Sequence, residues 1–408
     1  MRFVNLKKEK GKSADYICSE IEHIIKTYSK RDPGSEGEHK ASEYMAEELK
    51  KYSDDVKIED FKVNPDSFYG WIPITVTLML MAVVMYFFMP IISAVLLAVG
   101  VIIMLVQFVS YRKLIDKLFK EKISCNVTAI KKPTGEVKRR IFFNGHPDAA
   151  NEWTMNYHFG GKVMSIQVMI AFFGVVYAVA IIAVAMIMQG VGFVIAKSTT
   201  LYLGLAGLIF VPFWISIYGL SNKRIIVDGA NDNLTGCYLG IAILKALKEN
   251  NITFENTEVG VLLTGSEEAG LRGAKAWAKE HKHDYDDVET VIIAYDTIRE
   301  SKFLSVNVKD LNATVKTDEA LGNLFMRAAK NVGATCSFGS VPIGATDSAA
   351  FTQGGFRSIG ITAMDHNLKD YYHTRRDTYD NLDKDCLATT FEVSAETLDL
   401  FDKGEIDI

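Results

Sequence analysis

The sequence predicts an α/β fold with a mixed, mainly parallel central sheet flanked by helices, into which two transmembrane helical hairpins are inserted. Two observations lead to this prediction. Segments with strand and helix patterns alternate along the polar part of the chain, which is typical of a mainly parallel sheet. Three long runs, residues 72–111, 163–196 and 198–222, contain no charged residue, and a helix that crosses a bilayer needs about 20 apolar residues.

The uncharged runs divide into segments of spanning length. Pro90 splits the first run, and the second region turns around Lys197. We therefore expect hairpin 1 at 71–111 and hairpin 2 at 163–220, with four transmembrane helices at about 72–89, 91–109, 165–188 and 199–219. Buried core helices are the alternative interpretation, but uncharged runs of this length are too long for it.

Flanking charge predicts the orientation. The amino-terminal residues are charged and show no apolar leader, and about 70 mostly polar residues precede the first span. Basic residues flank both hairpins: Arg112, Lys113, Lys117, Lys120, Lys122, Lys162, Lys223 and Arg224. By the positive-inside rule we expect an integral protein of a prokaryotic plasma membrane whose polar part faces the cytoplasm.

Composition excludes some partners and compartments. The chain has 408 residues and a net charge of −5, so nothing suggests binding to nucleic acid. Its five cysteines are scattered without a CxxC pair, which predicts reduced thiols and not a disulfide framework. Oligomeric state stays open.

The polar segments 1–70, 112–162 and 221–408 are expected to form one domain. Apolar residues at helical spacing predict helices, and alternating or continuous short apolar runs predict strands. The expected helices are 12–30, 38–52, 235–248 and 273–281, and the expected strands are 56–63, 125–131, 139–144, 258–263 and 288–295. A turn at Pro133-Thr-Gly135 would join the second and third strands.

Metal-ligating side chains follow several of the predicted strands. His146, the pair Glu267-Glu268 and Asp296 each stand at a strand end, and the carboxyl ends of strands form the ligand crevice of open α/β sheets. Adjacent acids at the end of a buried strand repel each other unless a cation compensates them. A solvated acidic turn is the alternative for the glutamate pair.

Three further residues extend this pattern. Asp148 lies two residues after His146 and could accept a hydrogen bond from its second ring nitrogen. Asp232 precedes a predicted helix, where it is either an N-cap or a carboxylate that bridges two metals. His373 lies in a polar loop, as a surface histidine or as a ligand.

Taken together, these motifs resemble the co-catalytic di-zinc exopeptidases, whose relatives include bacterial aminopeptidases, glutamate carboxypeptidase and glutaminyl cyclase. The motifs are His-x-Asp at 146–148, Gly-Ala-x-Asp-Asn-x-Thr-Gly at 229–236, Glu-Glu-x-Gly-x-x-Gly at 267–273, Asp296 and His-Thr-x-x-Asp-Thr at 373–378, with Gly-Ser-Glu-Gly-Glu at 34–38. The resemblance implies a zinc exopeptidase-like fold, so the polar segments would form one catalytic metallopeptidase domain.

The resemblance also implies a role for each matched residue. Asp232 would bridge two Zn²⁺ ions, with a cis peptide bond to Asn233; Mn²⁺ or Co²⁺ would also suit the ligands. One metal would take His146 and Glu268, and the other Asp296 and His373. Glu267 would be the general base and Asp148 would orient His146. The metals would polarise the scissile carbonyl and acidify a water.

The implied function is a membrane-bound di-zinc metallopeptidase, with aminopeptidase activity as the first expectation. Carboxypeptidase or N-acyl amino acid amidohydrolase activity on the same site is the alternative. Glutaminyl cyclase, a non-catalytic receptor or scaffold of this fold, and a transporter are less favoured, because all the acid and histidine positions are kept and the spans are uncharged.

The partners follow from the membrane segments. We expect a lipid bilayer and a peptide substrate, with amphipathic or membrane-derived peptides favoured by a site near the membrane. Residues 114–123 would lie on the membrane surface or extend the preceding helix. Tyr371, Tyr372, Arg375 and Arg376 would grip the substrate or form loop surface. Asp347 resembles a family position beside the site and is given no role.

Overall fold

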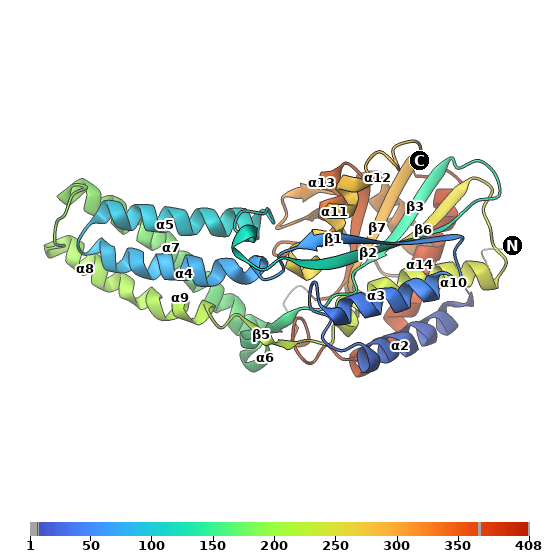
Figure 1. Cartoon of the computed structure of the whole chain (residues 1–408), viewed down its shortest axis with the longest axis horizontal. Coiled ribbons are helices and arrows are strands. Elements are labelled where there is room, and N and C mark those ends of the chain that lie inside the picture. The colour runs from blue at the N-terminus through green and yellow to red at the C-terminus, as the bar shows by residue number, and fades with distance from the viewer. Residues whose placement is uncertain (1–5, 7, 366–368, 407–408) are drawn as a thin grey trace.

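The computed structural model describes residues 6, 8–365 and 369–406 as an elongated molecule with two parts. An α/β part occupies one end, and a bundle of long helices projects from it at the other (Figure 1).

The α/β part is built on one sheet, with the strand order β1-β2-β6-β3-β7-β11-β8-β10 and with β9 paired to β8. Its strands are β1 (Asp55–Val63), β2 (Lys122–Lys131), β3 (Arg139–Gly145), β6 (Thr257–Thr264), β7 (Glu289–Ile298), β8 (Leu304–Asp310), β9 (Val315–Lys316), β10 (Ser337–Ser340) and β11 (Arg357–Ala363). The four central strands β6, β3, β7 and β11 are parallel, whereas β1, β2 and β8 pair antiparallel with their inner neighbours. The predicted mixed sheet with a parallel centre is confirmed.

Helices cover both faces of this sheet. Successive side chains of a strand point to opposite faces, so Phe143 packs in one apolar cluster and Phe142 in another. The first cluster contains residues of α2 (Lys10–Thr27), α3 (Glu36–Leu49), α10 (Thr235–Glu249), α12 (Glu319–Asn331) and α14 (Lys384–Asp402). The second contains residues of α11 (Arg272–Glu280) and α13 (Asp347–Gly354) together with the interior of the helical bundle. Burial on both faces explains why the central strands are continuously apolar.

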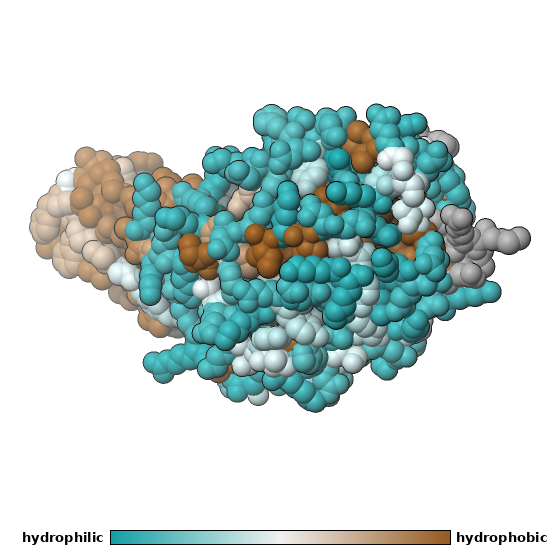
Figure 2. Space-filling model, turned by 45° about the vertical axis from the view of Figure 1, so that its right-hand side comes forward, coloured by the Kyte–Doolittle hydropathy of each residue, from teal (hydrophilic) through white to brown (hydrophobic). Residues whose placement is uncertain are grey.

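The projecting bundle comes from the two regions where the sequence predicts hairpins. It consists of α4 (Ser67–Tyr86), α5 (Pro90–Met104), α7 (Gly161–Gln189), α8 (Ser198–Gly207) and α9 (Val211–Ile217). Among the described residues, four helices are long and apolar enough to cross a membrane: Ser67–Tyr86, Pro90–Val109, Gly161–Gln189 and Ser198–Ile217. Hydrophobic side chains gather on the outside of this bundle, whereas the α/β part is mostly hydrophilic in the same view (Figure 2).

Both hairpins leave the α/β part near the carboxyl ends of the parallel strands. Hairpin 1 connects β1 to β2, and the end of β1 at Val63 pairs with the start of β2 at Lys122. Because β2 runs antiparallel to β6, this start lies beside the carboxyl end of β6. Hairpin 2 follows the short α6 (Thr154–Phe159) and is framed by a small ribbon of β4 (Asn151–Trp153) and β5 (Ser221–Ile226), shortly after the carboxyl end of β3.

Two segments refine the local predictions. The segment at Pro133-Thr-Gly135 joins β2 to β3 as expected, although β6 lies between these two strands in the sheet; the segment bonds to the residues before β6. For residues 114–123 the helical alternative is not observed, since a short 3₁₀ turn at Asp116–Leu118 leads directly into β2; a position on the membrane surface stays a prediction. The buried amide of Gln107 fixes that turn by accepting from the backbone of Leu114 and donating to Asp116.

Close contact between β3 and α10 gives a first testable prediction. A β-carbon at Gly145 would lie 2.3 Å from the backbone nitrogen of Cys237, so Gly145→Ala should force the strand away from the helix. We expect a loss of about 1–3 kcal/mol or more in unfolding free energy, the usual cost of overpacking, measured by thermal unfolding in detergent. Gly11→Ala is the control, because a β-carbon there meets nothing within 4 Å. Equal melting temperatures for both variants would contradict the prediction.

Candidate metal centre

Six ionisable side chains meet at the carboxyl edge of the parallel strands. His146 follows β3, Glu267 and Glu268 follow β6, and Asp296 lies near the end of β7. His373 comes from the loop after β11, and Asp232 from the turn that starts α10. Because β6, β3, β7 and β11 are parallel, their carboxyl ends come together at one place, which is the same edge from which both hairpins leave.

These side chains form two groups that share one carboxylate. The ligand atoms of His146, Glu267 and Asp296 lie within 4.8 Å of one another, and so do those of Asp232, Glu268 and His373. Asp232 faces both groups: its Oδ1 lies 3.4 Å from Nε2 of His146, and its Oδ2 lies 3.0 Å from Nε2 of His373. A carboxylate with one oxygen toward each group has the geometry of a bridge between two cations. The predicted cis peptide bond between Asp232 and Asn233 is present.

The structure corrects the expected division of the ligands. The sequence interpretation paired His146 with Glu268 and Asp296 with His373. In the structure, Nε2 of His373 lies 3.2 Å from Oε1 of Glu268, and His146 groups with Asp296. β3 has both β6 and β7 as neighbours, so strand order brings Asp296 and the glutamate pair close to His146, and it is Glu267, not Glu268, that falls in the group with His146.

The donor set fits bound divalent metal. Within the described residues, four buried atoms of the two groups have no hydrogen-bond partner: Nε2 of His146, Oδ2 of Asp232, Oε1 of Glu268 and Nδ1 of His373. Unpartnered buried polar atoms are rare in proteins because each costs free energy. The first three each lie 3.0–3.4 Å from a ligand atom of another residue of the two groups, and imidazole nitrogen with carboxylate oxygen is the ligand chemistry of zinc.

Electrostatics support the same conclusion. Burial raises the pKa of Glu267 well above its ordinary value, and Glu268 raises it further although His146 opposes this. Burial likewise raises the pKa of Asp296, and the charge of Asp232 adds to it. Burial alone would also raise the pKa of Asp232, but the imidazoles of His146 and His373 lower it below the ordinary range. Cations between these groups would relieve the repulsion.

Asp148 supports the site in two ways. Its Oδ1 lies 3.4 Å from Nδ1 of His146, where the sequence places an orienting carboxylate. Its two oxygens also accept from the backbone N–H groups of Glu267 and Glu268, each at 3.0 Å. One buried carboxylate therefore fixes both the imidazole and the turn that carries the two glutamates.

Asp377 holds the bridging carboxylate and was not given a role from the sequence. Its Oδ2 accepts from the backbone N–H of Asp232 at 3.1 Å, and its Oδ1 accepts from the backbone and side chain of Asn231. Asp377 stands in the motif that contains His373, and its position in that motif is the sequence feature that could have identified it. Fully buried Arg31 adds to this frame by donating to the carbonyls of Pro147 and Asp228.

Glu38 supports the glutamate turn from the other side. Its Oε1 accepts from the backbone N–H of Ser266 at 2.6 Å, and its Oε2 accepts from Gly34. Ser266 has a φ of 55°, an uncommon conformation for a residue with a side chain, and this hydrogen bond helps to hold it. The motif at 34–38 therefore acts on the site through the turn before Glu267.

Aromatic side chains enclose the site, and one of them comes from hairpin 1. The ring of Trp153 lies 4.5 Å from that of His373, and the ring of Tyr372 stacks on His373 at 4.2 Å. The indole of Trp153 donates to the hydroxyl of Tyr69, in the first turn of α4, at 3.2 Å. Neither Trp153 nor Tyr69 is marked by any motif, since the contact depends on how hairpin 1 leaves the sheet.

The return from hairpin 1 is anchored beside the turn that carries Glu267 and Glu268. Arg272 and Lys275, on the helix that follows the glutamate pair, both donate to the backbone carbonyl of Tyr111. Arg272 also pairs with Asp116 at 3.3 Å. A β-carbon at Gly270 would lie 2.9 Å from the ring of Phe68, so the turn after Glu268 packs directly on the base of α4.

The flanking residues of His373 differ in their surroundings. Arg375 forms two hydrogen bonds with Glu152, at 2.6 and 2.8 Å, and Arg376 lies on the surface against Tyr157. Tyr371 is buried near Glu300. Only Tyr372 lies against the metal-ligand groups. Asp347 accepts from Thr264 below the site, and burial raises its pKa to about 7.

Comparison with known proteins agrees with this geometry. Residues 216–398 match the model of peptidase family M28. The matched segment, which is less than half of the chain, is similar to that family. It contains five of the six clustered side chains, all but His146, and the match supports a zinc-dependent metallopeptidase. No curated protein sequence matches the chain at a significant level.

Solved structures show the same fold over nearly the whole chain. A zinc aminopeptidase from Bacillus subtilis has a TM-score of 0.58 at 13% identity, with 94% of each chain covered. An aminopeptidase from Aneurinibacillus sp. strain AM-1 has a TM-score of 0.58 at 12% identity, covering 97% of this chain and 95% of that one. A glutaminyl cyclase from Porphyromonas gingivalis has a TM-score of 0.53 at 11% identity, covering 95% and 97%.

The role of Asp377 gives a second prediction. Asp377→Asn removes one acceptor oxygen from the network that holds the Asp232 backbone. We expect affinity for zinc to fall about 10- to 100-fold, as for other residues that orient metal ligands, measured by metal content after dialysis against graded chelator. Asp380→Asn, on the exposed surface three residues away, should keep its zinc. Equal metal retention by both variants would rule out this supporting role.

Proposed function

We propose that the protein is a membrane-bound di-zinc aminopeptidase. The observation that supports this most directly is the position of Asp232, whose two oxygens face two separate groups of ligands. His146 and Asp296 would hold one Zn²⁺, and Glu268 and His373 the other, with Asp232 shared. The number of ions and the aminopeptidase specificity are both part of the proposal.

The remaining residues have distinct chemical tasks. When bound, the two cations supply positive charge that polarises the scissile carbonyl and acidifies a water. Glu267 projects into the first group with Oε2 3.8 Å from Nε2 of His146. Its carboxylate accepts the proton of the attacking water and returns it to the leaving amine nitrogen. The hydroxyl of Tyr372 stays protonated, because burial and the nearby carboxylates raise its pKa, and it donates to the substrate carbonyl.

Two features favour trimming from the amino terminus. Five of the six clustered side chains are at most 8% exposed, so an enclosed site suits a chain end better than the middle of a polypeptide. The site is rich in carboxylates, which suit an α-ammonium group. A carboxypeptidase would need a free cation for the substrate carboxylate, whereas nearby Arg375 is already paired with Glu152.

The bundle supports a location in the membrane. Four helices meet the length and composition of a bilayer span, and many of their large apolar side chains are exposed. Because both hairpins leave from the edge that carries the site, we propose that the site lies close to the cytoplasmic face of a prokaryotic plasma membrane. Amphipathic or membrane-derived peptides are then the proposed substrates.

A peptide digest tests the reaction. Purified protein in detergent with zinc should remove single residues from free peptides and leave N-acetylated peptides intact, as read by mass spectrometry. Glu267→Gln should lower the rate about 10²- to 10⁴-fold, the usual contribution of a general base, while zinc content stays unchanged. Glu280→Gln, on the exposed end of α11, should keep full activity.

Other outcomes would redirect the proposal. Trimming from the carboxyl terminus, or release of the acetyl group, would identify a carboxypeptidase or an N-acyl amidohydrolase. Cyclisation of amino-terminal glutamine would identify a glutaminyl cyclase. No turnover by a protein that holds its zinc would favour a receptor or scaffold. Full activity of Glu267→Gln would remove that residue from the mechanism.

Reporter fusions test the orientation. Green fluorescent protein fused at the carboxyl terminus should fluoresce, and alkaline phosphatase fused there should be inactive, because the polar part faces the cytoplasm. The same reporters inserted after Gly192, in the turn between α7 and α8, should give the opposite pair of signals. Identical signals at the two positions would show that hairpin 2 does not cross the bilayer.

A further inference from the structure

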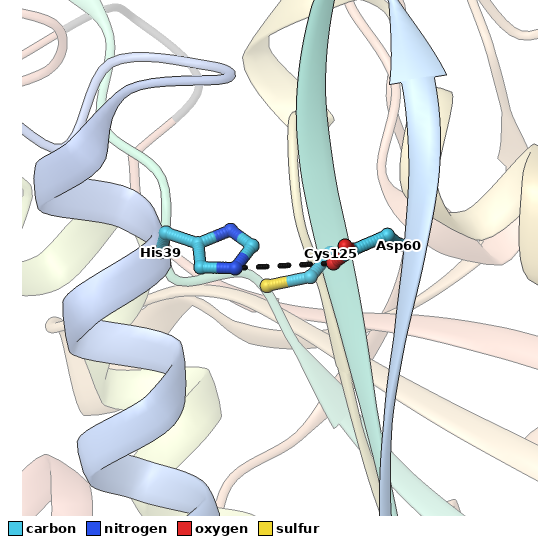
Figure 3. A group of neighbouring side chains, drawn as sticks. All are labelled: His39, Asp60 and Cys125. Carbon is cyan, nitrogen blue, oxygen red and sulfur yellow. Dashed lines mark ion pairs between the residues drawn. The ribbon is translucent and has the colours of Figure 1, made fainter.

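A second cluster of metal-ligating side chains lies outside the site described above. His39 comes from α3, Asp60 from β1 and Cys125 from β2 (Figure 3). One ligand atom from each of these residues lies within 4.8 Å of the other two. The cluster belongs to none of the motifs that predict the catalytic groups.

The fold brings these three residues together by a simple arrangement. Asp60 and Cys125 are directly opposite each other in the antiparallel pair of β1 and β2, and opposite residues of a pair share one face. That face is covered by α3, because Val127 and Ala129, which alternate with Cys125 in register, pack with Ala41 and Met45. His39 lies on the same helix and points toward the strand pair (Figure 3).

The distances suit a shared cation better than direct bonds. Nε2 of His39 lies 3.8 Å from Oδ1 of Asp60, which is too long for a hydrogen bond. Two ligands at tetrahedral angles around zinc lie about 3.5 Å apart, given bond lengths of roughly 2.0–2.3 Å. The thiol of Cys125 is buried, whereas the side chains of His39 and Asp60 are 32% and 61% exposed, so the cluster is open to solvent on one side only.

The charge around the thiol is also consistent with a cation. Burial, together with the carboxylates of Glu38, Asp60 and Glu43, raises the pKa of Cys125 to about 12. A thiol in these surroundings stays protonated and is a weak nucleophile, because the thiolate is the reactive form. The negative surroundings that disfavour a free thiolate attract a divalent ion, and a bound ion displaces the thiol proton.

We propose that His39, Asp60 and Cys125 form a second metal site, separate from the catalytic groups, for Zn²⁺ or a cation of similar softness. Its ligands are Nε2 of His39, Oδ1 of Asp60 and Sγ of Cys125, and water from the open side completes the coordination. The thiol proton is released to solvent on binding. A set of sulfur, nitrogen and oxygen ligands selects zinc, cobalt or cadmium over magnesium and calcium.

A metal at this position would clamp the support of the catalytic turn. His39 directly follows Glu38, whose carboxylate holds the N–H of Ser266. A β-carbon at Gly265 would lie 2.5 Å from the carbonyl oxygen of Cys125, so β2 also touches that turn. The ion would tie α3 to β1 and β2 behind Glu267, and its binding would raise the melting temperature of the protein.

Cobalt gives a readout that belongs to this site alone. The full chain in detergent is stripped with chelator and titrated with Co²⁺ without oxygen. A thiolate ligand gives a charge-transfer band in the near ultraviolet, and none of the proposed catalytic ligands contains sulfur. We expect this band to grow as Co²⁺ is added to the wild-type protein and to saturate with one ion bound at this site, in addition to any ions bound by the catalytic groups. His39→Asn and Asp60→Asn should each weaken it at least tenfold in apparent affinity, and Cys125→Ala should abolish it.

The controls separate this site from other cysteines and from misfolding. Cys237→Ala tests the other buried thiol near the catalytic groups and should keep the band, as should His283→Asn on the surface. The partly exposed His39 variant decides the matter if Cys125→Ala unfolds. No band in a wild-type protein that binds Co²⁺ elsewhere, or a band that survives Cys125→Ala or is lost in Cys237→Ala, would overturn the proposal. None of these outcomes depends on peptidase activity.

Discussion

The structure depends on keeping four carboxylates and two imidazoles together with little access to water. Charges buried in this way are costly unless they are compensated. Asp232 faces both groups of ligands, so a cation on each side of it would compensate the buried negative charge. The surrounding residues serve this constraint. Asp148, Asp377 and Glu38 accept from backbone N–H groups, so they fix the loops on which the ligands stand. The parallel strands bring the carboxyl ends that carry these loops to one place in the sheet.

The two hairpins are part of this arrangement and not a remote anchor. Each is inserted where the chain passes the site, and the base of hairpin 1 touches it twice, through Phe68 beside Gly270 and through Tyr69 at Trp153. Arg272 and Lys275 fasten the other end of that hairpin to the helix after the glutamates. A displacement of α4 relative to the sheet would therefore shift the side chains that lie next to Glu268 and His373.

Much of this could be predicted from the sequence, because strong local patterns specify it. The continuous apolar segments predicted the sheet, and the uncharged runs predicted the bundle regions. The spaced acids and histidines predicted which residues meet at the site. The expected division of the ligands differs from the grouping in the structure, because no local pattern reports which side chains of neighbouring strand ends and loops come together. The helical alternative for residues 114–123 is not observed, because one buried side chain, Gln107, fixes the turn there. Tyr69 and Trp153 were missed because no local pattern reports a contact between residues 84 positions apart.

The position of β3 has a consequence for how the protein is made. This strand lies between β6 and β7, and both of these neighbours are synthesised after hairpin 2. The parallel core therefore cannot form while the bundle is being synthesised. Until β6 and β7 follow, the apolar residues of β3 have no neighbouring parallel strand. On the membrane location proposed above, insertion comes first and folding of the enzyme second. A chain that ended after hairpin 2 would contain the whole bundle but lack β6 and β7, and β3 would have no neighbour in the sheet.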